Sequence, residues 1–194
     1  MSKVTIAGDV NGTGVFTIAA PNGNTNRTLT LPDEAGTIAT TAFVTNRLIQ
    51  NLNVTTGAVA TGTAKFVLND LVPQITQGVQ YMQLAITPTS VTSRLEITAT
   101  GNLSADVANF QILALFRDAV GDALGVVSLY NSQGGSTNIL VLSHSMIAGT
   151  TSEIIFRVRM GGVNAGTDTF NGRTAGRLHG GKLASSITIK EYAA

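Results

Sequence analysis

The stretch Glu153-Ile-Ile-Phe-Arg-Val-Arg-Met160 shows most directly what kind of fold this sequence builds. Its alternate residues Ile154, Phe156, Val158 and Met160 are apolar, and the residues between them include one Glu and two Arg. Successive side chains of a β-strand point to opposite faces of a sheet. This alternation therefore predicts a strand with one face toward a core and the other partly in water.

Strand signals of the same kind continue along the chain, with clusters of Gly, Asn and Asp between them. We expect strands at residues 65–69, 79–87, 93–100, 109–117, 124–130, 138–145, 152–160 and 186–192. Roughly eight strands in one domain are typical of an antiparallel sandwich such as a jelly roll. The predicted fold class is all-β, with an antiparallel jelly-roll knob over residues 65–194.

The composition excludes several classes of function. The 194 residues contain no Cys, which excludes zinc fingers, thiol catalysis and disulfide frameworks. Twelve basic residues against eleven acidic ones give a net charge of +1, so the charge offers no reason to expect binding to nucleic acid. No apolar run reaches the length of a signal peptide or a membrane span, and we expect neither classical secretion nor membrane insertion.

The low charge also predicts that other chains cover part of the surface. Only 12% of the residues are charged, whereas about a quarter is usual in a soluble domain. The stretch Phe110-Gln-Ile-Leu-Ala-Leu-Phe116 has apolar residues on both faces. Since one face of a sandwich strand points to the core, we expect Leu113 and Leu115 to meet a neighbouring subunit.

The first 64 residues differ from the rest. Residues 1–40 contain short strand-like runs broken by Asn-Gly turns, which cannot bury a core of their own, and we interpret them as a β-rich attachment arm. Residues 41–64 are predicted to form a short helical neck over 41–53 and a linker over 54–64. In the helix, Val44, Leu48 and Leu52 recur every four residues. This apolar stripe packs either on its own domain or against copies in a trimer.

Candidate catalytic and metal sites find little support in the sequence. The two histidines, His144 and His179, lie far apart, and no Gly-x-Ser-x-Gly motif accompanies them. Asp118 and Asp122 lack the ligand spacing of an EF-hand and are interpreted as a solvated turn. We therefore expect no enzyme activity, no cofactor and no metal.

A local excess of positive charge is the remaining chemical signal. Arg157 and Arg159 lie two residues apart on one predicted strand, and Arg173 and Arg177 follow in a Gly-rich loop. Paired guanidinium groups could hold an acidic glycan or another acidic partner. The alternative is that all four form a solvated strand face and loop, and the scarcity of aromatic residues supports that alternative.

Two parts of the sequence resemble a known class of proteins. The stretch from Gly14 to Val44 pairs an Ile-Ala-Ala-Pro run with Leu-Thr-Leu-Pro and Ala-Gly-Thr-Ile-Ala. It resembles a module found near the N-termini of bacteriophage virion proteins. The segments from Ser145 to Ser152 and from Gly180 to Glu191, with Phe156-Arg-Val-Arg and Thr169-Phe-Asn-Gly between them, are similar to the last strands of the globular heads of such proteins.

The resemblance implies a non-enzymatic phage structural protein that forms a trimeric knob on the virion surface. A short distance between arm and knob favours a capsid decoration protein, of the cement or head-fibre type, bound to the major capsid protein. The alternative is a tail fibre, bound to tail proteins, that recognises a host surface glycan. The expected homotrimer interface comprises Val44, Leu48, Leu52, Leu113 and Leu115.

Overall fold

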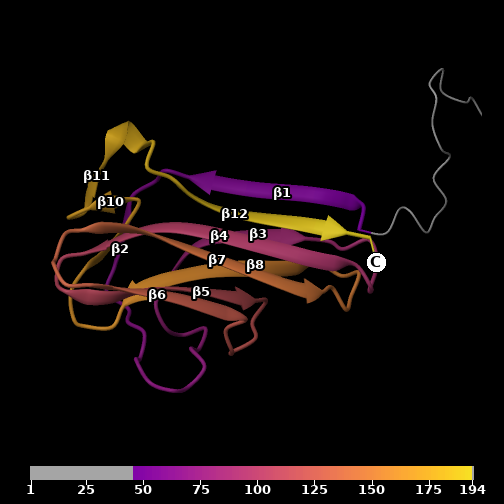
Figure 1. Ribbon diagram of the computed structural model, residues 1–194, viewed down its shortest axis with the longest axis horizontal. Helices are drawn as coiled ribbons and strands as arrows, with labels where there is room; N and C mark the ends of the chain where they lie inside the picture. Colours follow the sequence, from indigo (N-terminus) through magenta and orange to yellow (C-terminus); the bar gives the residue numbers. More distant parts are fainter. Residues whose placement is uncertain (1–45, 194) are drawn as a thin grey trace, which may run out of the picture. The chain divides into compact units, whose positions relative to one another are not determined.

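The computed structural model describes residues 46–193, and these form an antiparallel all-β structure (Figure 1). The predicted attachment arm over residues 1–40 and the predicted interface residue Val44 lie outside the described residues. Within the described part, no helix is long and apolar enough to cross a membrane.

Twelve strands and one short 3-10 helix make up this part of the chain. In order they are β1 (Leu48–Thr56), β2 (Ala60–Gly62), β3 (Val79–Ile86), β4 (Arg94–Ala105), β5 (Asn109–Arg117), β6 (Gly125–Asn131), β7 (Thr137–Ile147), β8 (Ile154–Gly162), β9 (Asp168–Phe170), β10 (Gly172–Arg173), β11 (Gly176–Arg177), η2 (His179–Gly181) and β12 (Ser185–Tyr192).

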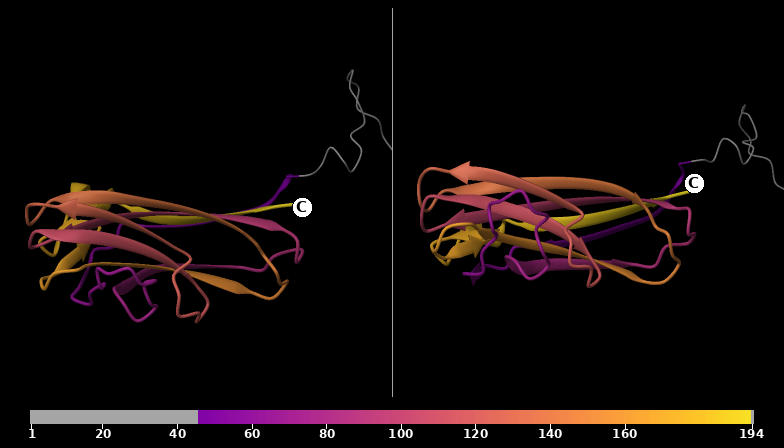
Figure 2. Two further views of the ribbon diagram at one scale, coloured as in Figure 1. Left: turned by 60° about the horizontal axis from the view of Figure 1, so that its bottom comes forward. Right: turned by 90° about the horizontal axis from the view of Figure 1, so that it is seen from below.

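The long strands form two sheets that pack face to face. The first sheet has the order β1-β12-β4, with β7 on the other side of β4 and the short strands β9 and β2 continuing beyond the end of β12. The second sheet has the order β3-β8-β5-β6. The long strands run along the long axis of the view, and most of their connecting loops lie at its ends (Figure 2).

The pairing of the eight long strands is nested. The first pairs with the last, β1 with β12. Moving inward, β3 pairs with β8, β4 with β7, and β5 with β6. The chain therefore follows the path of one long hairpin that has been rolled into two layers.

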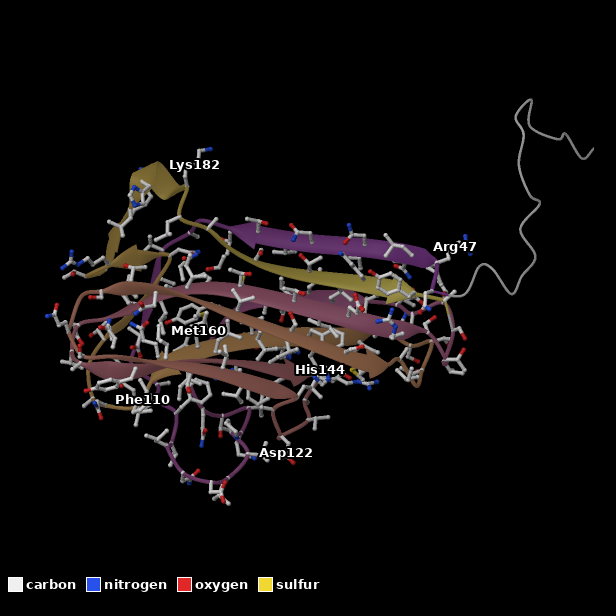
Figure 3. All side chains as sticks on the ribbon, in the orientation of Figure 1. Arg47, Phe110, Asp122, His144, Met160 and Lys182 are labelled. Atoms are coloured by element: carbon white, nitrogen blue, oxygen red, sulfur yellow. The ribbon has the colours of Figure 1, made fainter. Side chains whose placement is uncertain are left out.

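A single apolar core fills the space between the sheets. From the first sheet it takes alternate residues of β4, β7 and β12, such as Ile97, Leu142 and Ile189, and from the second it takes residues of β3, β5 and β8. The predicted inward face of β8 is confirmed, since Ile154, Phe156, Val158 and Met160 are all fully buried. Met160, which is labelled in Figure 3, belongs to this core.

The predicted helix over residues 41–53 is wrong from Leu48 onward, where β1 begins and pairs with β12 through Thr56. The reason is that a spacing of four residues is also a multiple of two. Apolar residues spaced by four can therefore share one face of a strand as well as one face of a helix. In β1 the register shift between Leu48 and Gln50 then turns Leu48 away from the face that Leu52 occupies. Leu52 packs against the core, and the following residues join the sheet, so the linker predicted over 54–64 contains the end of β1 and all of β2.

The predicted strand over residues 65–69 is a loop. The segment between β2 and β3, residues 63–78, lies on the outer face of the second sheet, where Phe66 and Ile75 pack against Ile112, Ala114 and Phe116 of β5. Both faces of β5 are consequently covered by the chain itself. Leu113 and Leu115 face the main core and are fully buried. The expectation that they meet a neighbouring subunit is wrong.

Candidate functional site

The residues predicted to carry the site do not come together. Leu113 and Leu115 are core residues, Leu52 packs partly on the core, and Leu48 is 47% exposed at the start of β1. Of these four residues only Leu48 is largely exposed. Within the described residues, the predicted trimer-interface residues therefore do not form one shared exposed surface.

The two arginines of β8 hold loops in place. Arg157 donates a hydrogen bond from Nε to the carbonyl oxygen of Asp118 at 3.0 Å and one from Nη1 to Oε1 of Gln83 at 2.6 Å. Arg159 donates to the carbonyl oxygens of Gln77 and Gly78, both at 2.8 Å. Both guanidinium groups thus donate hydrogen bonds within the chain itself. Few of their N–H donors remain for the paired contacts that an acidic sugar would need.

Burial lowers the pKa of Arg159, and the neighbouring positive charge of Arg157 lowers it further. Arg173 and Arg177 lie on β10 and β11, which form a separate two-stranded sheet, and their side chains are exposed. The structure therefore separates the four predicted glycan contacts into two loop-holding residues and two exposed residues.

Asp118 and Asp122 also have structural partners. Oδ1 of Asp118 accepts a hydrogen bond from the backbone N–H of Ile155 at 2.8 Å, and Oδ1 of Asp122 accepts one from Nε2 of Gln74 at 2.8 Å. His144 lies on β7 and His179 in η2. Among the described residues, no group of three or more His, Asp or Glu is placed to hold a metal ion.

A different feature stands out, the side of the sandwich where β6 and β7 lie. Each is the edge strand of its sheet, because within the described residues β6 pairs only with β5 and β7 only with β4. Six apolar side chains on these two strands are between 42% and 62% exposed. We call this set the β6–β7 edge: Val126, Leu129, Tyr130, Ile139, Val141 and Ile147.

The β6–β7 edge lacks every device that normally protects a free sheet edge. Soluble proteins shield such edges with charged side chains, proline or β-bulges, because an unpaired apolar strand invites association. Residues 123–152 contain no Asp, Glu, Lys, Arg or Pro. Both strands pair with their neighbours without a register shift. An edge of this kind is suited to contact with another chain.

The opposite side of the sandwich makes the contrast clear. Its edge strands are β1 and β3, and each carries a register shift in its pairing, at Leu48/Gln50 and at Gln80/Met82 respectively. Exposed polar side chains such as Asn51, Asn53 and Gln83 line these strands. A bulge and a polar edge both disfavour strand-to-strand association. The two sides therefore differ, because the β1 and β3 edges carry register shifts that disfavour strand association and the β6 and β7 edges carry none.

The outer face of the first sheet offers a surface that such an edge can cover. Its central residues are Thr98 and Thr100 on β4, Thr188 on β12 and Ser143 on β7, which share one face by their pairing register. Charged residues on this face gather at one end, where Arg94 pairs with Glu96 and its guanidinium lies over the ring of Tyr192. The centre of the face is uncharged and rich in short hydroxyl side chains, and Val141 of the β6–β7 edge, which pairs with Thr100, borders it.

The signal for the β6–β7 edge is present in the sequence, as a run of 30 residues without a charge or a proline. The run alone does not indicate an exposed edge, because strands buried in a core also lack charged residues and proline. Only the sheet order places both strands of the run at free edges.

Comparison with known proteins gives no family. No protein-family model matches the chain, and no curated protein matches it. Solved structures match with low scores. Dimeric latent PorU from Porphyromonas gingivalis is 10% identical with a TM-score of 0.39, over 77% of this chain and 13% of that chain.

Two viral structures also match. The VP2 subviral particle of infectious bursal disease virus is 13% identical with a TM-score of 0.33, over 77% of this chain and 39% of that chain. The enzymatically active domain of tailspike protein 4 from bacteriophage CBA120 is 16% identical with a TM-score of 0.25, over 62% of this chain and 18% of that chain. The chain spans well under half the length of each, and likenesses this weak assign no function.

Proposed function

We propose that this protein is a non-enzymatic structural component of a bacteriophage virion, in which a trimeric jelly-roll knob projects from the particle surface. The phage assignment is supported by the resemblance of residues 14–44 and of the C-terminal strands to virion proteins. The nested pairing of eight long strands in two layers supports the jelly roll. The observation that carries the assembly is the unprotected β6–β7 edge.

The proposed assembly is a ring in which two different parts of the molecular surface meet, the β6–β7 edge of one copy and the centre of the outer face that Val141 borders on the next copy. The β6–β7 edge of one copy lies on the uncharged outer face of the first sheet of the next copy. Contacts between two different surfaces of one molecule generate a closed ring when the rotation between copies closes. Three copies is the number that the resemblance implies. Assembly would also account for the low charge of the chain, because the ring removes apolar edge from water.

The assembly is tested by measuring the mass of the purified full-length chain at micromolar concentration by light scattering. We expect three chains per particle. The double substitution Ile139→Lys and Val141→Lys places two like charges in the contact and should yield monomers of unchanged secondary structure. A matched control, Leu71→Lys with Val91→Lys, charges two side chains that are 73% and 52% exposed elsewhere and should remain trimeric. A wild-type monomer, or a trimeric Ile139/Val141 variant, overturns the interface.

Within the virion class we propose a capsid decoration protein, of the cement or head-fibre type, that binds the major capsid protein through residues 1–40 and stabilises the shell. A three-dimensional reconstruction of the particle distinguishes this role from its alternative. Hundreds of copies on the capsid support decoration, whereas a few trimers at the tail support a receptor-binding tail fibre. Deleting residues 1–40 should leave a folded knob that no longer attaches to particles, and continued attachment would refute the arm.

A further inference from the structure

One end of the described structure carries a concentration of positive charge. The hairpin of β10 and β11 and the turn η2 lie at the end opposite Tyr192 and the C-terminus (Figure 1), and Figure 3 shows Lys182 and Arg47 at opposite ends. Between residues 169 and 190 the chain has four basic residues and no acidic one. Three of the four, Arg173, Arg177 and Lys182, are exposed on this end.

The two arginine side chains rest on the backbone of glycines. Gly135 and Gly181 have φ angles of +82° and +84°, which favour glycine. A Cβ atom at Gly135 would lie 3.0 Å from Nη2 of Arg173, and one at Gly181 would lie 3.2 Å from Cδ of Arg177. Each side chain therefore packs closely over the backbone of a glycine. No hydrogen bond to another described residue uses either guanidinium, so their N–H donors remain available to a ligand.

A small open hollow of about 190 Å³ lies beside this hairpin. It is lined by Asp106, Thr167, Thr169, Thr174 and Ala175. The backbone of Asp106 also abuts Gly134, the neighbour of the glycine under Arg173, so the hollow and this arginine belong to one surface. Ligand pockets usually measure about 300–1,000 Å³, so this hollow suits a single sugar ring.

Hydrogen bonds hold the walls of the hollow in one arrangement. The backbone N–H of Thr167 donates to Oδ1 of Asp106 at 2.8 Å, and the backbone N–H of Ala175 donates to Oγ1 of Thr169 at 3.1 Å. Thr174 and Ala175, at the tip of the hairpin, have φ angles of +50° and +61°. Strained residues held by their surroundings cluster at ligand sites, and a surface ordered in advance loses little entropy on binding.

We propose that this end of the molecule binds a saccharide polymer that bears carboxylate or phosphate groups. The planar guanidinium groups of Arg173 and Arg177 form paired hydrogen bonds with the anionic groups of the polymer. The hydroxyl groups of the threonines can donate or accept hydrogen bonds with the hydroxyl groups of a sugar ring in the hollow, and the carboxylate of Asp106 accepts them. The site is formed within one chain, so it goes beyond the proposed virion role and does not depend on the trimer.

The test measures binding of the full-length chain to four immobilised polymers, which are alginate, phosphorylated dextran, neutral dextran and polyglutamate. We expect binding to alginate, to phosphorylated dextran or to both, and little to neutral dextran or polyglutamate. Alginate separates a carboxylate ligand from the phosphate ligand that phosphorylated dextran represents. The double substitution Arg173→Ser and Arg177→Ser should weaken this binding at least about tenfold, since two charge-assisted contacts are lost.

A matched control, Arg47→Ser with Lys190→Ser, also removes two positive charges and should bind as the wild type does. Thr167→Ala should weaken binding severalfold by removing a hydroxyl group from the hollow. Melting temperature and assembly state, measured on every variant, separate a lost site from a lost fold or interface. Absence of binding to both anionic saccharides, equally strong binding to polyglutamate, or equal losses in the arginine variant and its control would each overturn the proposal.

Discussion

The ammonium group of Lys65 lies 2.8 Å from Oδ2 of Asp168, whose side chain is 1% exposed. The same oxygen accepts a hydrogen bond from the backbone N–H of Gly162 at 2.8 Å. Three segments therefore meet at one carboxylate: the loop over residues 63–78, the end of β8 and the short strand β9. A three-residue strand has few hydrogen bonds of its own, so this ion pair helps to fix its position beside β4.

Breaking this ion pair from one side should be costly. Lys65→Met leaves the buried carboxylate of Asp168 without its partner, and we expect the free energy of unfolding to fall by about 3–5 kcal/mol. The double variant Lys65→Met with Asp168→Asn removes both charges and should recover much of the loss. Urea unfolding of the two variants and the wild type measures the difference. A double variant no more stable than the single one would show that the pairing is not what holds the segment.

Arg159 should control the order of the loop that covers the second sheet. Its guanidinium bridges the carbonyl oxygens of Gln77 and Gly78, a geometry that the single ammonium group of lysine cannot reproduce. Arg159→Lys should therefore lower the free energy of unfolding by about 1–3 kcal/mol. Amide hydrogen exchange should quicken in residues 66–78 more than elsewhere. Arg173→Lys, at an exposed site, is the control and should leave both measurements unchanged.

Tyr81 should make the fold sensitive to alkaline pH. Its ring stacks on Phe170 with centroids 4.6 Å apart, and burial, followed by the negative charge of Asp168, raises the pKa of Tyr81 from 10.0 to about 12. The folded state thus favours the neutral phenol. This contribution to stability is complete below pH 10 and is lost as the pH rises toward 12. Thermal unfolding between pH 9 and pH 12 should show a smaller decline in Tyr81→Phe than in the wild type.

Glu191 should act in the opposite direction, at acid pH. Its carboxylate is buried at the end of β12, which raises its pKa, but the polar groups of Ser93, Thr89 and Gln50 around it outweigh burial and leave the pKa below the usual 4.5. Oε1 accepts hydrogen bonds from the backbone N–H and the hydroxyl of Thr89, each at 2.7 Å. The ionised form is therefore favoured in the folded state.

This stabilisation is present above pH 4.5 and is lost as the pH falls through the lowered pKa of Glu191. Glu191→Gln should be less stable than the wild type near neutral pH by about 1–3 kcal/mol, because a charged acceptor is lost from a buried cluster. The difference between the two proteins should shrink on acidification. Equal stability at pH 7 would contradict the assigned role of the carboxylate in holding the turn before β4.

Local patterns in the sequence were sufficient to predict most of the long strands. The strand over residues 109–117 coincides with β5, and the inward residues of β8 were predicted correctly. The physical reason is that a strand alternates its side chains with a period of two wherever it lies. A pattern of that kind needs no knowledge of the rest of the fold. It assigns faces to a strand without saying what covers each face.

What covers each face was decided only by the tertiary structure. Leu113 lies in the main core, and the other face of β5 is covered by a loop whose anchor, Phe66, lies more than forty residues earlier in the chain. The same holds for β1, whose spacing fits a helix or a strand until β12 pairs with it. Residues 123–152 show their lack of charge in the sequence, but only the sheet order makes β6 and β7 free edges. Burial and pairing between distant segments are properties of the folded chain, and they determine which apolar residues are left for a partner.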